Sequence, residues 1–307
     1  MDRFLESPLA AGFLLVVTLL LHGCAVSPQK SAERGQLHSR QAAAKLEKAT
    51  DADSLAAAGL LSDRDRSLVL LTKATEAAPQ RADLAWLQAQ FCQEVAGCDP
   101  EPIERGLRGL DSSNGAGWMG ELVRANAAKD AARDAALEAI SHSDRVDIYW
   151  TTLIARLSRA AAGTGAMTLQ EARVAVTGYL AAHAIPAYSA VSNACKGERL
   201  QRSETVETCR GVAKAFQQGD TTITEMIGVA IAKRVWPEDS PQWQAAAAAR
   251  RVYEYRSKLW QTLDNGRWDS PAAAERYLAL CEHDRREQDV FLAQLIEAGG
   301  HPNPPSK

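Results

Sequence analysis

The chain has 307 residues, 46% of them hydrophobic, and its formal net charge at pH 7 is −3. A charge so close to zero argues against the basic footprint of a nucleic-acid-binding protein and against a polybasic membrane surface. We therefore expect no nucleic-acid partner, and any attachment to a membrane has to come from another source, such as acyl chains.

Residues 9–21 (LAAGFLLVVTLLL) form an almost unbroken apolar run near the N-terminus. A transmembrane helix needs about 20 apolar residues, so this run is too short to span a bilayer. Its length and position are typical of the hydrophobic region of a secretory signal peptide.

The run ends in LHGC, residues 21–24, which resembles the lipobox of bacterial lipoproteins. The resemblance implies that residues 1–23 are a signal peptide, cleaved before Cys24, and that Cys24 then carries lipid. Ala25 stands where an inner-membrane retention signal would have Asp, which implies an outer-membrane location facing the periplasm. A plain signal peptide or a misassigned start codon is the alternative reading.

Residues 24–40 are polar and show no apolar periodicity after the cysteine. This composition predicts a flexible tether that begins at Cys24. At ~3.3 Å per residue, such a tether reaches at most about 50 Å.

Most of the remaining chain predicts helix, because alanine is abundant and no run of alternating polarity is convincing. TITE at residues 222–225 reads as a capping box with Thr222 as the cap. DSP at residues 269–271 puts Ser270 at a cap and proline in the first turn. Glycines and a proline end the last helix and leave residues 299–307 as a disordered tail. The expected fold class is all-α.

Three tryptophans, Trp86, Trp118 and Trp150, lie 32 residues apart, twice in succession. Two helices of about 12 residues and their turns fill such an interval, which predicts helical hairpins over residues 41–160. One hairpin cannot bury its apolar stripe alone, so successive hairpins stack. We expect the three rings to fill the core between neighbouring hairpins rather than to contact a ligand.

Two segments in this region resemble junctions between tetratricopeptide repeats. They are LVLLTKATEAAPQRADLAWL at residues 68–87 and LDSSNGAGW at residues 110–118. The resemblance covers about residues 52–160 and implies a solenoid of helical hairpins.

The 32-residue register ends near residue 160, and GTGA at residues 163–166 predicts the loop before a C-terminal helical region, residues 167–298. This region is rich in tryptophan and tyrosine. On one predicted helix, Tyr253 and Trp260 lie seven residues apart and therefore share a face. They are either buried against a second neighbour or line a groove that binds a partner.

The cysteine spacing predicts two disulfides. Cys92 and Cys98 flank one turn, while Cys195 and Cys209 bracket a polar loop. Nearby cysteines tend to pair in an oxidising compartment, and buried free thiols are the alternative. Cys281 is left over and is expected to be a buried core thiol.

No motif for a reaction stands out. The sequence lacks HExxH, GxSxG and a P-loop, and its histidines are scattered, so we expect no metal and no cofactor. Two classes of function remain. The first is a non-catalytic scaffold at the outer membrane that binds an envelope protein or peptide. The second is an enzyme, or an enzyme accessory, in cell-wall or envelope maintenance, with a site in the aromatic-rich C-terminal region.

Overall fold

The computed structural model describes residues 28–128, 131–263 and 270–305, and this part of the chain is helical without a named strand. Its one isolated β-bridge pairs Asn114 with Arg145. The expected all-α class is therefore confirmed. The LHGC motif and Cys24 lie outside the described residues.

Two short 3₁₀ helices, η1 and η2, interrupt the α-helices. In chain order the elements are α2 (Pro28–Leu46), α3 (Ala52–Leu60), α4 (Arg64–Ala77), α5 (Ala82–Glu94), α6 (Glu101–Leu110), η1 (Gly115–Trp118), α7 (Met119–Ala128), α8 (Ala131–Ser141), α9 (Trp150–Gly163), α10 (Leu169–His183), α11 (Ser189–Ala194), η2 (Gly197–Gln201), α12 (Ser203–Gln217), α13 (Thr222–Val235), α14 (Pro241–Leu263), α15 (Pro271–His283) and α16 (Glu287–Glu297).

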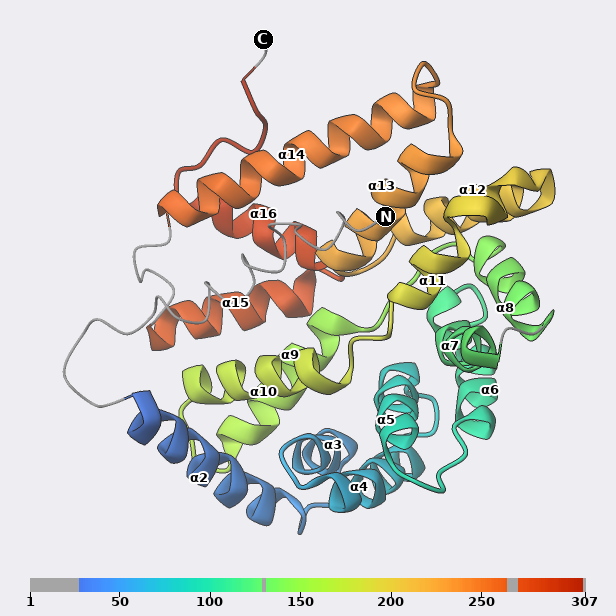
Figure 1. Ribbon diagram of the computed structural model, residues 1–307. Coiled ribbons are helices and arrows are strands. Elements are labelled where there is room, and N and C mark those ends of the chain that lie inside the picture. Colours follow the sequence, from blue (N-terminus) through green and yellow to red (C-terminus); the bar gives the residue numbers. More distant parts are fainter. Residues whose placement is uncertain (1–27, 129–130, 264–269, 306–307) are drawn as a thin grey trace.

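Helices α3 to α8 pack on one another in chain order, with η1 between α6 and α7. The order then changes, because α8 packs against α12 rather than against α9. Helix α12 in turn packs against α13, and α13 packs against α14. Helix α9 makes its main contacts with α3, α10, α15 and α2, so it carries the chain back to the start of the row (Figure 1). One hydrophobic core consequently includes residues from both predicted parts, 41–160 and 167–298.

The three tryptophans differ in burial. Trp86 is 1% exposed and Trp150 is 7% exposed, and both belong to the main core. Trp118 packs against the same core but is only partly buried. The guanidinium of Arg108 lies over its ring, 4.1 Å from the centroid, so a cation–π contact covers one face.

The polar segment after Cys24 differs from the predicted tether, because residues 28–46 form α2. The second half of α2 has an amphipathic stripe in which Ser39, Ala42, Ala43 and Leu46 are buried. The first half lacks such a stripe, which is why the sequence pattern indicated a flexible segment. Only three residues of the sequence, 25–27, separate Cys24 from the start of α2.

Two predicted caps have different outcomes. The N-cap of α13 is Thr221 rather than Thr222, and its hydroxyl accepts a hydrogen bond from the Thr224 amide at 3.1 Å. The predicted start of α15 is confirmed, with Ser270 as the N-cap and Pro271 in the first turn.

The described part of the C-terminal tail, residues 299–305, differs from the predicted disordered tail because it lies against α14. The carbonyl of Pro302 accepts a hydrogen bond from Nε of Arg256 at 2.8 Å. A Cβ atom at Gly300 would lie 3.0 Å from the Leu259 side chain, so the glycine permits this close approach.

We predict that the tryptophans rank in stability as they rank in burial. Trp86→Ala removes a fully buried ring and should cost ~3–5 kcal/mol of unfolding free energy. Trp118→Ala should cost clearly less, because its ring is partly exposed and partly covered by Arg108. Urea unfolding monitored by circular dichroism measures both values, and a larger loss for Trp118→Ala would contradict the packing described above.

Candidate functional site

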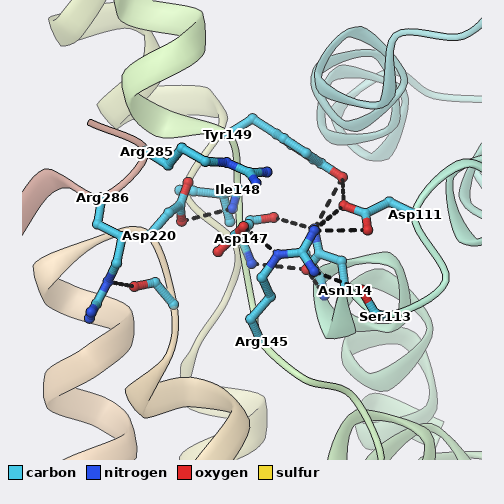
Figure 2. A network of polar contacts seen from close by, with 12 residues as sticks. Asp111, Ser113, Asn114, Arg145, Asp147, Ile148, Tyr149, Asp220, Arg285 and Arg286 are labelled. Atoms are coloured by element: carbon cyan, nitrogen blue, oxygen red, sulfur yellow. Dashed lines mark hydrogen bonds and ion pairs between the residues drawn. The ribbon is translucent and has the colours of Figure 1, made fainter. Parts of the chain in front are cut away.

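A polar network surrounds the crossover segment, residues 142–149, which links α8 to α9 (Figure 2). Three turns contribute to it. They are the turn between α6 and η1 at 111–114, the turn between α12 and α13 at 218–221, and the turn between α15 and α16 at 284–286. The network therefore joins the N-terminal row of helices to the C-terminal helices.

Asp220 fastens the end of the crossover segment. Its side chain is buried, and its two carboxylate oxygens accept hydrogen bonds from the amides of Ile148 at 2.9 Å and Trp150 at 2.8 Å. Gly219 allows the turn to come close, since a Cβ atom there would lie 2.7 Å from the Val146 carbonyl oxygen. Amides at the start of a helix have no acceptor within the helix itself. At the start of α9, the side chain of Asp220, from a distant turn, is that acceptor.

Glu287, the first residue of α16, holds the same junction from the C-terminal side. Its amide donates to the Asp220 carbonyl at 2.7 Å. Its carboxyl group accepts a hydrogen bond from the Thr222 amide at 2.8 Å. Two carboxyl groups, that of the buried Asp220 and that of the half-buried Glu287, therefore serve the N-terminal ends of α9 and α13.

Arg145 anchors the other side of the crossover segment. Its Nε donates to Asp147 at 2.6 Å, one amino group donates to both oxygens of Asp111 at 2.9 Å, and the other donates to the Ser113 hydroxyl at 2.7 Å. Asn114 pairs with the backbone of Asp147, accepting from its amide and donating to its carbonyl, each at 2.9 Å. These contacts hold the crossover segment against the α6–η1 turn.

Tyr149 is in the left-handed region, with φ 59° and ψ 32°, immediately before α9 begins. It is the one non-glycine residue with positive φ in the described ranges. Such a conformation costs on the order of 1–3 kcal/mol and persists only where its surroundings enforce it. Here the hydroxyl of Tyr149 donates to Asp111 at 2.8 Å and accepts from Asn114 at 3.1 Å.

Burial dominates the electrostatics of this junction. It raises the pKa of Asp220 to about 8, with a further contribution from the charge of Asp147. Burial likewise raises the pKa of Glu287 and, against the opposing effect of Arg145, the pKa of Asp147. The pKa of Tyr149 is raised by burial and by its hydrogen bond to Asp111, which disfavours the tyrosinate.

These properties define a structural junction. A general base or nucleophile needs an atom that a substrate can reach. Asp220 is buried and Glu287 is half-buried, and the carboxyl groups of both already accept backbone hydrogen bonds. The raised pKa of Tyr149 keeps its hydroxyl protonated, and a protonated tyrosine cannot act as a general base.

Part of this network corresponds to a repeated Arg-x-Asp spacing in the sequence, which the spacing of the tryptophans alone did not reveal. The segments RADLAW and RVDIYW both carry an Asp two residues after an Arg. Arg81 binds Asp83 and also Asp53, with nitrogen–oxygen distances of 2.7 and 3.0 Å. Arg145 binds its own Asp147 and a distant Asp in the same way. The repeat therefore preserves an ion-pair geometry as well as a tryptophan.

Tyr253 lines a groove between α13, α14, α16 and the tail. The groove has a volume of about 220 Å³, and its walls include Met226, Phe291, Arg256 and Asn303. Of the 23 residues of α14, only two alanines are classed as buried, so the long helix keeps much of its surface accessible. Of the two alternatives that the sequence left open for Tyr253, burial against a second neighbour or a groove, the structure has a groove beside this residue.

Trp260 does not belong to the residues that line this groove. Its ring packs against Phe291, with 5.1 Å between the ring centroids. The two aromatic residues of α14 therefore have different surroundings. Tyr253 faces the groove, and Trp260 supports the Phe291 wall.

A second, more polar groove lies between α8 and α12, and the sequence gave no indication of it. It has a volume of about 890 Å³ and is lined by charged side chains such as Glu138, Glu207 and Arg210 together with Trp236. Arg210 donates to Glu207, and its guanidinium lies 6.0 Å from the ring centroid of Trp236. The two helices that form most of its lining, α8 and α12, are more than 60 positions apart in the chain.

The cysteines are arranged as the spacing predicts. Cys92 and Cys98 form one disulfide pair, with Cα atoms 5.3 Å apart, and Cys195 and Cys209 form the other, with Cα atoms 5.7 Å apart. Cys281 is a buried free thiol whose pKa burial raises to about 12, so it stays protonated at neutral pH.

Among the residues that the structure describes, no group of three or more His, Cys, Asp or Glu side chains is placed to hold a metal ion. Within the same ranges, no helix combines the length and apolar content that crossing a bilayer requires. Comparison with protein families, curated proteins and solved structures finds no match to this chain.

The raised pKa values predict how stability depends on pH. A carboxyl group with a folded pKa of about 8 and an ordinary pKa of 3.8 binds its proton more tightly in the folded state. The unfolding free energy should therefore fall between these pH values, by at most about 1.4 kcal/mol per pH unit for each proton. Urea unfolding at a series of pH values measures this slope.

Asp220→Asn tests whether Asp220 causes this dependence of the unfolding free energy on pH. Asn cannot ionise, so the slope should become flatter, while the loss of one acceptor lowers stability at acidic pH by ~1–3 kcal/mol. Asp239→Asn, a substitution in the turn before α14 and far from the junction in the fold, is the control. An unchanged slope in Asp220→Asn would show that Asp220 is not the titrating group.

Proposed function

We propose that the protein is a non-catalytic lipoprotein, held at the outer membrane through an acylated Cys24 and facing the periplasm. Its stacked, tetratricopeptide-like hairpins form a rigid frame, and the C-terminal helices present a groove to an envelope protein or an extended peptide. The observation that carries the binding part of this proposal is the groove beside Tyr253. The membrane part rests on the resemblance of LHGC to a lipobox.

The size of the groove favours recognition of a side chain. Pockets for small molecules usually have volumes of ~300–1,000 Å³, and this groove is smaller, at about 220 Å³. It suits one anchoring side chain of a peptide, which could contact Phe291 and Met226 while Arg256 and Asn303 offer polar contacts. A tyrosine in such a position combines a large apolar area with a hydroxyl, as binding hot spots commonly do.

The charged groups in the groove favour binding over catalysis. Glu225 is a carboxylate in its lining, and it forms an ion pair with Arg286 at 3.3 Å. The carboxyl groups of Asp220 and Glu287 belong instead to the junction, where they accept hydrogen bonds from backbone amides. Glycoside hydrolysis, the chemistry expected of a cell-wall enzyme, would need two carboxylates that converge on one bond.

We predict that Tyr253→Ala weakens the complex with the partner, whereas Tyr255→Ala does not. Both tyrosines are partly buried on α14, but only Tyr253 is among the residues that line the groove. Crosslinking in intact envelopes, followed by quantitative mass spectrometry, should show at least about fivefold less crosslinked product for Tyr253→Ala, since a hot-spot side chain contributes more than ~1 kcal/mol.

Two results would contradict the binding proposal. One is equal crosslinking in both variants when circular dichroism shows that both are folded. The other is turnover of peptidoglycan by the purified protein that is abolished by substitution of one carboxylate, which would instead establish the enzyme alternative.

We also predict that Cys24→Ala releases the protein from membranes or leaves an uncleaved precursor, because acylation at Cys24 would be lost. Fractionation of cells and intact-mass measurement distinguish these outcomes, and Cys281→Ala serves as the matched control. Normal processing and membrane retention in Cys24→Ala would refute lipid anchoring at this residue.

A further inference from the structure

The first half of α2 projects from the body of the protein. Every side chain that the structure describes from Glu33 to Leu37 is exposed, and the buried stripe begins only at Ser39. Leu37 is 54% exposed, which is unusual for a large apolar side chain that could have been placed against the core.

Helix α2 carries a local positive charge that the net charge of the chain conceals. It contains Lys30, Arg34, Arg40 and Lys45 against the single acidic residue Glu33, which gives a net charge of +3. The whole chain carries −3, so the other residues together carry −6. The charge is therefore concentrated in the helix that directly follows Cys24.

The arginines of α2 are not neutralised within the protein. Arg34 and Arg40 are exposed and make no ion pair with a described carboxylate, and Lys45 donates to the carbonyl of Thr164 at 2.9 Å. Just after α2, by contrast, Glu47 is held by Arg66 at 2.8 Å. Arg34 and Arg40 are consequently available to an external anion.

A second apolar side chain lies on the helix that packs against α2. Helices α2 and α10 are in contact, and His38 lies 3.2 Å from Glu171 across their interface. Val174, one turn after Glu171, is 57% exposed, and Leu37 is adjacent to His38 in sequence. Basic and apolar side chains are therefore present together on this side of the molecule.

The short stretch of chain between Cys24 and α2 limits how far α2 can lie from Cys24. Four Cα–Cα steps separate Cys24 from Pro28, and they span at most about 14 Å. If Cys24 is acylated, as the proposed function requires, the start of α2 is held within that distance of its lipid attachment point. Positions 30, 34 and 37 share one helix face.

We propose that α2 lies on a bilayer surface rich in anionic phospholipid. Its cations contact the headgroups, while Leu37 and Val174 enter the interfacial layer. Each Lys or Arg near such a surface strengthens attachment about fivefold. The proposal rests on the lipid anchor of the proposed function, and it places the protein body on the membrane rather than at the end of a long tether.

The test uses the full, lipidated protein reconstituted into vesicles of phosphatidylcholine alone or with 30% phosphatidylglycerol, a composition of about one anionic lipid in three. A spin label is attached at Leu37→Cys, and its relative accessibility to oxygen and to a nickel chelate is measured. Val69→Cys is the matched control, because Val69 is 46% exposed on α4. Intact mass confirms acylation of each sample.

The expected result is that the label at position 37 becomes oxygen-accessible and nickel-protected in the anionic vesicles, while the label at position 69 stays aqueous in both. Arg34→Glu with Arg40→Glu should abolish the change. Arg251→Glu with Lys258→Glu, two exposed cations of α14, should leave it intact.

The proposal is overturned if acylated protein sits on anionic vesicles with position 37 in water. It is also overturned if the label responds to soluble peptidoglycan but not to vesicles. Failure of the lipid anchor itself would be recognised separately, because the protein would then lack the acyl mass and would not remain with the vesicles.

Discussion

The structure depends on a buried carboxyl group, that of Asp220, which holds the start of α9 in place. Without it, the amides of Ile148 and Trp150 would be buried in the junction and unpaired, at a cost of ~1–3 kcal/mol each. The position of α9 matters because this helix packs against α3, α10 and α15 and so joins the two ends of the fold. Local hydrogen bonds thereby decide the arrangement of helices that are far apart in sequence.

The regular spacing in the first half of the chain has two physical components. The tryptophans fill space, as Trp86 does in full and Trp118 only in part. Arg81 and Arg145 each bind an acidic residue from an earlier part of the chain, Asp53 at the start of α3 and Asp111 in the α6–η1 turn. Residues 113–118, which occupy the equivalent place in the middle of the spacing, contain no Arg–Asp pair. There Asn114 forms the contact with the crossover segment, through hydrogen bonds to the backbone of Asp147. The repeats are thus alike in shape but differ in the polar groups that connect them.

The sequence predicted the features that depend on neighbouring residues. Helical class, the Ser270 cap and both disulfide pairs follow from composition or short spacing, and all are present in the structure. Contacts that depend on the path of the chain were not predictable. The meeting of Asp220 with Ile148 joins residues 72 positions apart. Helix α2 was missed because its first half has no apolar stripe, and Trp260 was misplaced because helical spacing cannot show which neighbour covers a face.

Native-state hydrogen exchange of the Ile148 and Trp150 amides tests the central role of Asp220 most directly. If Asp220 holds the junction that positions α9, both amides exchange only when the whole protein unfolds. Their exchange free energies then equal the unfolding free energy from urea denaturation. Exchange of either amide through a local opening, at a free energy well below the global value, would contradict the account.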